Sequence, residues 1–484
     1  MSVHPTELVA RLPTASPRVE LIGAPPDQAL TMVTHDSREV RPGALFCCVV
    51  GRTVDGHDHA AEAVAKGAVA LLCERPLDLG VWELRVDNVR EAMGHVAAAF
   101  HDHPSRSLEV VGVTGTNGKT TVAWWLRAVL DAAGRSCGLI GTIGGPRTTP
   151  EATDLQAMLA AWRDEGRTSV AMEVSSHALA LSRVEGTWFS MAVFTNLGRD
   201  HLDFHPSRED YFKAKAKLFD PSRTAAAVVN VDDPHGRLLL DAALVPTRAY
   251  SLADVTDLHV GMTSCHGVWQ GRRLEVPAGG SFNVSNALAA ATAALELGID
   301  ADVIVEGLAG AVPVPGRFQA VHAGQPFGVI VDYAHTPDGL DQMLQALRSV
   351  TTGRVIVVFG CGGDRDQGKR ALMGEVAAER ADIVIATSDN PRSEDPQRIL
   401  DAIVKGAKGV KGAGVLEVEQ DRRAAIARAL SLAHAGDVVL VAGKGHETTQ
   451  TIGDVVLDFI DPAVVTEEWG RIERGGTVDR GDGS

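Results

Sequence analysis

The chain has 484 residues, of which 45% are hydrophobic and 22% are charged, and its formal net charge is −16. At about 150 residues per domain, this length predicts roughly three domains that each bury a core of their own. The negative charge argues against nucleic acid as a partner, although a local basic pocket for one small anion remains compatible with it.

Neither a targeting segment nor a metal-binding cysteine pattern is visible. The first residues lack the cationic and apolar segments of a signal peptide, and no run of about 18 apolar residues occurs, so we expect a cytoplasmic protein without membrane insertion. The six cysteines are scattered and form no CxxC pair. They therefore predict neither a structural zinc site nor a disulfide framework.

Short apolar runs between turns characterise the first part of the chain. Residues 44–50 and 68–73 are apolar, and the sequence HDHPSRS separates them from the run LEVVGVTG, which begins at Leu108. A polar stretch that contains proline marks a loop between structural elements. We therefore predict a smaller N-terminal α/β domain over residues 1–105.

Apolar runs alternate with helical patterns from residue 106 onward. LEVVGVTG precedes the helical stretch KTTVAWWLRAVLDAAG, and the apolar runs in SVAMEVSS and AAAVVNVDD follow. Such alternation is typical of a mainly parallel sheet flanked by helices. We predict a central domain over residues 106–315, which ends at a hinge-like linker around Pro313, Pro315 and Gly316.

A second set of apolar runs follows this linker. They lie in FGVIVDYAH, GRVIVVFGCGG, ADIVIATSDN and GDVVLVAGKG, and each ends in glycine or polar residues. The pattern again predicts parallel strands that alternate with helices. We therefore predict an independent C-terminal α/β domain over residues 316–484.

The strongest local motif is the glycine-rich turn GVTGTNGKTT at residues 112–121. It lies between a predicted strand and a predicted helix, where backbone N–H groups and the helix N-terminus can bind phosphates. Lys119 would reach the β and γ phosphates, and Thr120 would bind Mg²⁺. The strict pattern GxxxxGK[ST] is not met, because Val113 occupies its first glycine position. A glycine turn without a ligand is the alternative.

The segment AMEVSSHAL places Glu173 at the end of an apolar strand. Open α/β sheets bind their ligands at the carboxyl ends of the strands, and Mg²⁺ prefers carboxylate oxygen. Glu173 is therefore a candidate metal ligand. A simply solvated carboxylate is the commoner outcome for an isolated glutamate in this position, and this motif alone does not decide between them.

A lysine occupies the apolar face of the helix predicted in SREDYFKAKAKLF. At about 100° per residue, Lys213 pairs with Glu209 on the exposed face, whereas Lys215 lies in line with Tyr211 and Leu218. Desolvation would lower the pKa of Lys215 and favour a reactive neutral amine. The open alternative is that its ammonium group extends to solvent.

Together these segments resemble the Mur ligase family, ATP-dependent enzymes that add amino acids in peptidoglycan synthesis. The similar strings include TGTNGKTT, MEVSSHAL, VPGRF, VDYAHTPD, GCGGDRDQGKR, DNPRSEDP and AGKGHE. The resemblance extends from DSREVRPGALF to beyond GKGHE, which is nearly the whole chain. The most similar type of member, the MurE type, adds a diamino acid to UDP-N-acetylmuramoyl-L-alanyl-D-glutamate.

The resemblance implies the domain roles and the reaction. It implies an N-terminal domain for the UDP-sugar, a central P-loop ATPase and a Rossmann-like C-terminal domain that brings the amino acid. ATP and Mg²⁺ would activate the D-Glu side-chain carboxylate as an acyl phosphate, which the amine of meso-diaminopimelate would then attack. The reaction would serve cell wall biogenesis, and through it cell shape and cell division.

Residue roles also follow from the resemblance. The implied catalytic residues are Lys119, Glu173, His201 and Lys215. The implied Mg²⁺ ligands are Thr120, Glu173, His201 and Lys215, the last as a carbamate formed with CO₂. The implied ATP-binding residues are Gly115, Thr116, Asn117, Gly118, Lys119, Thr120, Thr121, Asn286, Arg317, Asp332 and His335. The residues implied to bind the UDP-sugar dipeptide are Ser37, Arg52, Thr53, Val54, Thr148, Thr149, Ser175 and Arg183.

The implied diaminopimelate-binding residues are Arg365, Asp389, Asn390, Pro391, Arg392, Gly443 and Glu447. Arg365 and Arg392 could each pair with one carboxylate of meso-diaminopimelate, and Asp389 and Glu447 could accept from its ammonium groups. Lysine lacks the distal carboxylate. An arginine at position 392 therefore favours diaminopimelate, and the resemblance associates DNPR with this substrate.

Departures from the family pattern leave alternatives open. Gly198, Ala371 and Thr449 stand where family members more often carry serine, proline and tyrosine. A paralogue that joins another amino acid or a modified acceptor in a side pathway is the main alternative. DSREVRPGALF and DNPR disfavour a folylpolyglutamate-type ligase, and the presence of all four implied catalytic residues disfavours a nucleotide-binding scaffold without catalysis. The sequence indicates no oligomeric state.

Overall fold

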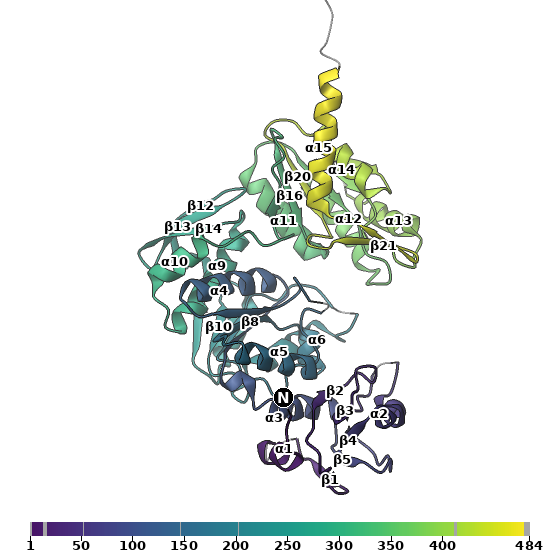
Figure 1. The fold of residues 1–484 in the computed structure, drawn as a ribbon. Helices are drawn as coiled ribbons and strands as arrows, with labels where there is room; N and C mark the ends of the chain where they lie inside the picture. Colours follow the sequence, from purple (N-terminus) through teal and green to yellow (C-terminus); the bar gives the residue numbers. More distant parts are fainter. Residues whose placement is uncertain are drawn as a thin grey trace, which may run out of the picture.

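The computed structural model describes residues 2–12, 17–51, 53–145, 147–201, 203–410 and 414–478. Three lobes lie in a row, with the N-terminal lobe at the bottom of Figure 1 and the C-terminal lobe at its top. Each lobe is built around its own main sheet, and most neighbouring strands in these sheets are parallel. The prediction of a multidomain α/β protein with mainly parallel sheets is confirmed. Residues 105 and 315 each separate the main sheet of one lobe from that of the next, so we propose these positions as the domain boundaries.

The N-terminal lobe contains a five-stranded sheet in the order β1-β5-β4-β3-β2, in which only the edge strand β1 is antiparallel to its neighbour. The strands are β1 (Glu20–Ile22), β2 (Met32–Thr34), β3 (Ala44–Cys47), β4 (Ala68–Cys73) and β5 (Trp82–Arg85). The helices are α1 (Pro5–Arg11), α2 (Ala60–Ala65) and α3 (Val89–Phe100), with short 3₁₀ turns η1 (Gly56–His59) and η2 (Pro104–Arg106). Helix α3 begins where the Asn88 side chain accepts from the backbone N–H of Glu91, which satisfies a free helix donor.

The central lobe contains a six-stranded, fully parallel sheet in the order β11-β10-β9-β6-β8-β7. The strands are β6 (Glu109–Thr114), β7 (Cys137–Ile140), β8 (Ser169–Glu173), β9 (Met191–Phe194), β10 (Ala227–Asn230) and β11 (Thr247–Tyr250). The helices between them are α4 (Lys119–Ala132), α5 (Ala152–Asp164), α6 (Ser176–Ala180), α7 (Arg208–Ala216) and α8 (Pro234–Asp241), with the short turns η3 (Lys217–Phe219) and η4 (Leu252–Asp254). The strand runs are apolar on both sides because helices cover both faces.

An antiparallel sheet and two helices complete this lobe. The sheet consists of β12 (Val255–Val260), β13 (Cys265–Trp269) and β14 (Arg272–Val276), and the helices are α9 (Ser281–Glu296) and α10 (Ala301–Ala309). Helix α9 packs against α4, and its alanine-rich face is buried in the largest core cluster. Small side chains let these two helices approach closely, which fixes the position of the residues at the start of α4.

The C-terminal lobe contains a six-stranded sheet in the order β15-β16-β20-β17-β18-β19, in which only β15 is antiparallel. The strands are β15 (Gln319–Ala320), β16 (Gly328–Asp332), β17 (Val355–Phe359), β18 (Ile383–Ala386), β19 (Val415–Val418) and β20 (Val438–Ala442). A hairpin of β21 (Thr449–Ile452) and β22 (Val455–Asp458) follows β20. The helices are α11 (Pro337–Val350), α12 (Lys369–Arg380), α13 (Pro396–Ala407), α14 (Arg422–Leu432) and α15 (Asp461–Val478).

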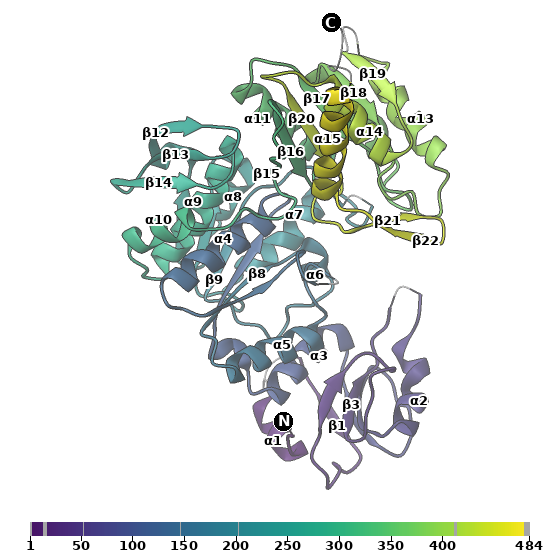
Figure 2. The ribbon, with the colours of Figure 1, turned by 45° about the horizontal axis from the view of Figure 1, so that its top comes forward.

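Figure 2 shows the β21 and β22 hairpin on the side of the C-terminal lobe that faces the rest of the molecule. The polar ends of β16, β18 and β20 carry the predicted motifs DYAH, DNPR and GKGHE, so the parallel sheet brings three distant segments to one edge. Within the described ranges, no helix combines the length and the apolar character that a bilayer-spanning segment needs.

Two glycines allow the N-terminal and central lobes to touch backbone to backbone. A Cβ atom at Gly94 in α3 would collide with the carbonyl oxygen of Glu185, and one at Gly186 would collide with the carbonyl oxygen of Gly94. Gly186 also has a φ of +76°, a conformation that favours glycine. The orientation of α3 on the central lobe therefore depends on the absence of these side chains.

Substitution Gly94→Ala is expected to lower the free energy of unfolding by about 1–3 kcal/mol, because the added methyl group meets backbone that cannot rotate away. Urea unfolding measures this change. Gly475→Ala is the matched control, since a Cβ at Gly475 in α15 meets nothing within 4 Å. We expect the control to gain up to about 1 kcal/mol from helix propensity. Equal stability of wild type and Gly94→Ala would refute the packing argument.

Candidate active site

The glycine-rich turn connects β6 to α4 and leaves the start of that helix open. A Cβ at Gly115 would collide with the Thr195 hydroxyl, and one at Gly118 would collide with the Asn286 side chain. Gly118 precedes α4 with a φ of +85°, and no side chain caps the helix there. The first backbone N–H groups of α4 are therefore free to bind an anion, aided by the helix dipole.

Lys119 and Thr120 extend from this first turn toward the carboxyl edge of the sheet. The Lys119 ammonium group donates to the carbonyl oxygens of Gly115 at 2.9 Å and Thr116 at 2.8 Å. The Thr120 hydroxyl donates to Glu173 Oε2 at 3.0 Å. Glu173 is buried at the end of β8, and its other oxygen accepts from the backbone N–H of Thr142 at 2.7 Å. A phosphate-binding turn and a fixed carboxylate thus lie side by side.

Lys215 is only 1% exposed, and this burial excludes the alternative that its ammonium group extends to solvent. Its Nζ atom donates to the Gly115 carbonyl at 2.7 Å and lies 4.5 Å from the centre of the Tyr211 ring. Burial lowers the pKa of Lys215 well below its usual value, and the nearby Lys119 ammonium adds to the shift. The predicted neutral amine therefore has a structural basis. Lys213 pairs with Glu209 on the exposed face, as the helix pattern predicts.

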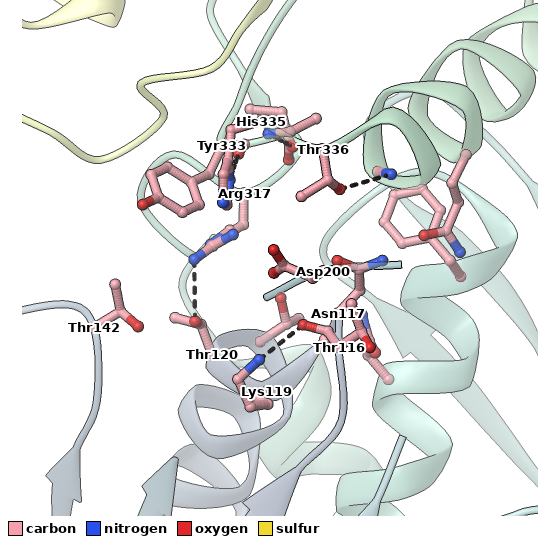
Figure 3. Close-up of a pocket in the computed structure, with 18 of the residues that line it drawn as sticks. Thr116, Asn117, Lys119, Thr120, Thr142, Asp200, Arg317, Tyr333, His335 and Thr336 are labelled. Carbon is pink, nitrogen blue, oxygen red and sulfur yellow. Dashed lines mark hydrogen bonds between the residues drawn. The ribbon is translucent and has the colours of Figure 1, made fainter. Parts of the chain in front are cut away.

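An arginine from the C-terminal lobe reaches into the same space. Arg317 Nη2 donates to the Thr120 hydroxyl at 3.2 Å, and its guanidinium carbon lies 4.4 Å from the centre of the Tyr333 ring. Figure 3 shows Arg317 between Tyr333 above and Thr120 below, on the far side of the cavity from Lys119. Two lobes therefore contribute cations to one cavity, which concentrates positive charge where an anion would bind.

Asp332 ends β16 and holds the segment that carries Arg317. Its carboxylate accepts from the backbone N–H groups of Phe318 at 2.6 Å and Ala334 at 2.7 Å. Burial raises the pKa of Asp332 to about 6, although Arg317 and these two N–H groups oppose the shift. Its position fixes both the Arg317 backbone and the DYAH turn.

Two half-buried histidines line the cavity in their neutral form. Burial lowers the pKa of His201 and of His335 to about 4. His201 has a φ of +55°, and its Nε2 atom lies 3.3 Å from Asp200 Oδ2. His335 donates from Nδ1 to the Tyr333 carbonyl at 2.8 Å, while Lys369 donates to the His335 carbonyl at 2.7 Å. These contacts fix both imidazole rings at the cavity wall.

One cavity at the junction of the central and C-terminal lobes brings most of the predicted nucleotide residues together. Glu173, His201, Lys215, Thr148 and Ser175 line the same cavity. Gly115 is not among the lining residues, but its carbonyl oxygen accepts from both Lys119 and Lys215. The predicted nucleotide residues in its wall are Thr116, Asn117, Gly118, Lys119, Thr120, Thr121, Asn286, Arg317, Asp332 and His335.

The donor set at the phosphate turn fits Mg²⁺ only with added oxygen ligands. Among the residues that the structure describes, no three His, Cys, Asp or Glu side chains form a cluster that could hold a metal ion. Mg²⁺ commonly binds one or two protein oxygens and completes its shell with water and substrate phosphates. The Thr120 hydroxyl and the Glu173 carboxylate, 3.0 Å apart, match that requirement.

The residues predicted for the UDP-sugar dipeptide divide between two cavities. Ser37 and Val54 line a second cavity between the N-terminal and central lobes, whereas Thr53 is exposed and not among its lining residues. Arg52 lies outside the described residues. Arg183 Nη2 pairs with Glu151, which lines the second cavity, at 2.9 Å.

Two threonines lie between Arg147 and Pro150, which line the second cavity, and Thr148 itself lines the first. The Thr149 hydroxyl donates to the Glu173 carbonyl at 2.9 Å and accepts from the Ser175 backbone N–H at 3.1 Å. The Thr148 hydroxyl lies 3.0 Å from the hydroxyl of Thr142. These contacts fix the segment with Thr148 and Thr149 against the end of β8, where Glu173 lies.

The predicted amino-acid residues gather at the polar ends of β18 and β20. Asn390 Nδ2 donates to Glu447 Oε2 at 2.7 Å, and Gly443, with a φ of +111°, lies against the buried Asp389 carboxylate. Burial raises the pKa of Asp389. Asn390 and Glu447 share a shallow cavity with Thr142 of the central lobe, so this cavity also spans the lobe junction.

The two predicted arginine clamps are placed unequally. Arg392 is half-buried, with a φ of +54°, and its Nη1 atom donates to the Gly363 carbonyl at 2.7 Å. Arg365 is exposed, and both side chains flank Gly362. Pro391 is buried, and its carbonyl oxygen lies close to Gly363. Only Arg392 lines the cavity that contains Glu447.

Four residues that the sequence analysis did not assign contribute directly to these sites. Asp200 contacts His201, the Thr142 backbone N–H donates to Glu173, and the Tyr333 ring packs against the Arg317 guanidinium group. Lys444 donates to Glu447 at 3.2 Å. Tyr333 and Lys444 lie inside the family strings VDYAHTPD and AGKGHE, and Asp200 directly precedes the assigned His201, so assigned neighbours in the sequence were the available signal. Thr142 lies in a loop that carries no motif.

Three family models match successive parts of the chain. Residues 29–101 match the Mur ligase family catalytic domain, residues 113–294 match the Mur ligase middle domain, and residues 316–445 match the Mur ligase glutamate ligase domain. Together these matches cover most of the chain, and each falls within one lobe.

Relatives match over nearly the full length. A Streptomyces coelicolor protein named UDP-N-acetylmuramoyl-L-alanyl-D-glutamate--2,6-diaminopimelate ligase is 46% identical, over 94% of this chain and 96% of its own length. A Geobacillus thermodenitrificans protein of the same name is 46% identical, over 91% and 95%. A solved structure of a ligase with this name is 33% identical, with a TM-score of 0.69 over 98% of this chain and 100% of its own.

Acidification is expected to destabilise the protein through its neutral histidines. The pKa of His335 is about 4 when folded and 6.5 ordinarily, so the unfolded chain binds more protons between those values and stability falls as pH falls. We expect the free energy of unfolding to fall by about 1–2 kcal/mol less in His335→Asn than in wild type when the pH is lowered from 7 to 5. Asparagine retains a donor for the Tyr333 carbonyl. Urea unfolding at both pH values measures the difference, and the contribution of Asp332 cancels because both proteins contain it. Identical losses would contradict the burial argument.

Proposed function

This chain belongs to the Mur ligase family, and we propose that it is an ATP-dependent ligase that joins meso-diaminopimelate to UDP-N-acetylmuramoyl-L-alanyl-D-glutamate in peptidoglycan synthesis. The observation that carries the proposal is the single cavity in which Lys119, Lys215 and Arg317 from two lobes surround a free helix N-terminus and the Glu173 carboxylate. The relatives that bear this name support the same reaction over the whole length of the chain.

Amide formation from a carboxylate requires activation, because the anionic carboxylate repels nucleophiles and an oxide ion is a poor leaving group. In the proposed first step, the D-Glu side-chain carboxylate attacks the γ-phosphorus of ATP, the bond to ADP breaks, and an acyl phosphate forms. Lys119, the N–H groups of α4 and Arg317 would stabilise negative charge on the transferred phosphoryl group, because they line the same cavity. Mg²⁺, bound by Thr120 and Glu173, would supply further positive charge beside the phosphates.

The second step forms the amide. A neutral amine of the amino acid attacks the acyl carbon, a tetrahedral intermediate forms, and phosphate leaves with the electron pair of the carbon–oxygen bond while the amine loses a proton. The cavity with Asn390 and Glu447 borders Thr142 of the central lobe, so the amino acid would lie across the junction from the phosphate turn. Contact between the two lobes would exclude water from the acyl phosphate.

We propose that Lys215 carries a carbamate in the active enzyme. The structural support is a lysine with no carboxylate partner among the contacts of its Nζ atom, buried beside the phosphate turn and shifted toward the neutral amine that can capture CO₂. A carbamate would add two oxygen atoms and a negative charge beside Thr120 and Glu173. His201 lines the same cavity and completes the proposed set.

Replacement Lys215→Met is expected to reduce turnover by at least about a thousandfold, because an apolar side chain supplies neither ammonium nor carbamate. Folding is expected to be retained or improved, since an unpaired buried amine is replaced by an apolar group of similar length. Phosphate release and thermal unfolding measure the two effects.

Short carboxylates added to Lys215→Ala should partly restore turnover by replacing the carbamate oxygen atoms. Undiminished turnover of either variant would rule out the role.

Phosphate release in the presence of ATP, Mg²⁺ and the UDP-muramoyl dipeptide should depend on meso-diaminopimelate and be much weaker with lysine or ornithine. The physical reason is that Arg392 can pair with the distal carboxylate, which the other two amino acids lack.

Arg392→Gln should lower kcat/KM for meso-diaminopimelate by about ten- to a hundredfold and leave kcat/KM for lysine nearly unchanged. Mass measurement of the product identifies the amino acid joined. Equal rates with all three amino acids would refute the specificity, and preference for another amino acid or acceptor would favour a side-pathway ligase.

A further inference from the structure

Lys444 is a fully buried lysine that contacts Asn390 and Glu447 from behind the cavity they line, and the proposed reaction leaves it without a role. It lies in the turn after β20, between Gly443 and Gly445, and its side chain is 0% exposed. Its Nζ atom lies 2.5 Å from the Thr449 carbonyl, 3.2 Å from Glu447 Oε2 and 3.4 Å from Asn390 Oδ1. An ammonium group can donate three hydrogen bonds, and these three acceptors use all of them.

The three acceptors belong to three segments of the C-terminal lobe. Glu447 is in the turn after β20, Thr449 begins the hairpin strand β21, and Asn390 is in the loop after β18. Asn390 and Glu447 lie 57 positions apart in the chain. The Lys444 ammonium group therefore connects the loop after β18, the turn after β20 and the hairpin. No single helix or strand fixes the position of these segments relative to one another.

Lys444 and Asn390 converge on the same carboxylate oxygen. Asn390 Nδ2 donates to Glu447 Oε2 at 2.7 Å, and Asn390 Oδ1 accepts from the Thr451 backbone N–H at 2.9 Å. Glu447 is thus oriented by two donors on one oxygen, and the loop after β18 is tied to the hairpin by the same asparagine. A carboxylate fixed in this way meets an incoming ammonium group at a defined angle.

The hairpin in turn holds the backbone of Arg392. The Arg392 N–H donates to the Thr451 carbonyl at 3.1 Å, and the Gly453 N–H donates to the Arg392 carbonyl at 2.7 Å. Arg392 has a φ of +54°, an uncommon conformation for a residue with a side chain. Its direction therefore depends on the position of β21, whose first residue accepts from Lys444.

Charged groups of both signs lie near Lys444. Asp389 and Glu447 are the nearby carboxylates, and Arg422, which is paired with Asp461 in the buried core, is the nearby cation. Removal of the Lys444 charge would leave Asn390 as the one donor to Glu447 Oε2. It would also increase the repulsion between the Asp389 and Glu447 carboxylates. Breaking one partner of a buried pair has a larger effect than the pair contributes to stability.

From these contacts we propose that Lys444 is a positioning residue for the incoming amino acid, which orients Glu447 toward the ammonium group and holds the hairpin that sets the direction of Arg392. The inference rests on the proposed function, because it assumes that an amino acid binds at Glu447 and Arg392. Lys444 itself acts through these two residues, since its three hydrogen bonds are taken by protein groups.

The test uses Lys444→Met in the full-length chain, with Lys408→Met as the control, because Lys408 is an exposed lysine at the end of α13 of the same lobe. The KM for meso-diaminopimelate should rise about ten- to a hundredfold in Lys444→Met, as expected when a charge-assisted contact is lost. The KM values for ATP and the UDP-muramoyl dipeptide should stay within about twofold, since the phosphate turn is in another lobe. The preference for meso-diaminopimelate over lysine should also fall, because Arg392 loses its support.

A double-mutant cycle with Glu447→Gln separates positioning from general stabilisation. If Lys444 acts through Glu447, the added effect of Lys444→Met should be several times smaller in the Glu447→Gln background. Equal effects in both backgrounds, an unchanged KM for the amino acid, or parallel rises of all three KM values would overturn the inference. Wild type that releases no phosphate with any amino acid would instead refute the proposed function.

Lys444→Arg keeps the test decisive if Lys444→Met does not fold. Arginine retains the charge, but its planar fork cannot place three donors around one atom as an ammonium group does. We expect a smaller but selective rise, about three- to tenfold, in the KM for meso-diaminopimelate. An unchanged value for this folded variant would overturn the inference.

Discussion

The hydrogen bond from Arg317 to Thr120 joins the two lobes at the point where the chemistry is proposed to occur. Thr120 belongs to the phosphate turn of the central lobe, and Arg317 follows the linker into the C-terminal lobe. Asp332 fixes this arginine by binding the backbone of the next residue, and Tyr333 supports its guanidinium face. A cavity with cations from both lobes exists only while the C-terminal lobe rests on the central one. The proposed nucleotide and amino-acid sites would therefore be coupled through lobe position.

Two lysine amines lie close together inside the site. Lys119 and Lys215 both donate to the Gly115 carbonyl, and burial lowers the pKa of each. Two amines that share one carbonyl oxygen repel each other when both are protonated, which favours the neutral form of the fully buried Lys215. The phosphates of a nucleotide, and a carbamate on Lys215, would both relieve this repulsion. Under the proposed function, the same cluster of amines would contribute to binding of the charged substrates.

The sequence predicted the parts of the fold and site that depend on local pattern. Alternating apolar runs indicated the parallel sheets, and helix periodicity placed Lys215 on the buried face, which the structure confirms. The pattern could not decide whether its ammonium reached solvent, because that depends on Tyr211 and on the glycine turn one hundred positions away. Lys444 was missed for the same reason: its acceptors come from three segments. Thr142 carried no signal, since only the sheet edge brings it to Glu173.

Transfer of oxygen from the acceptor to phosphate tests the proposed chemistry most directly. The UDP-muramoyl dipeptide is prepared with heavy oxygen in the D-Glu side-chain carboxylate and allowed to react with ATP and meso-diaminopimelate. If the carboxylate attacks the γ-phosphorus and phosphate leaves the acyl carbon, each released phosphate carries one oxygen atom from the carboxylate, as mass spectrometry would show. Released phosphate that contains only oxygen from ATP and water, while the amide still forms, would contradict activation through an acyl phosphate.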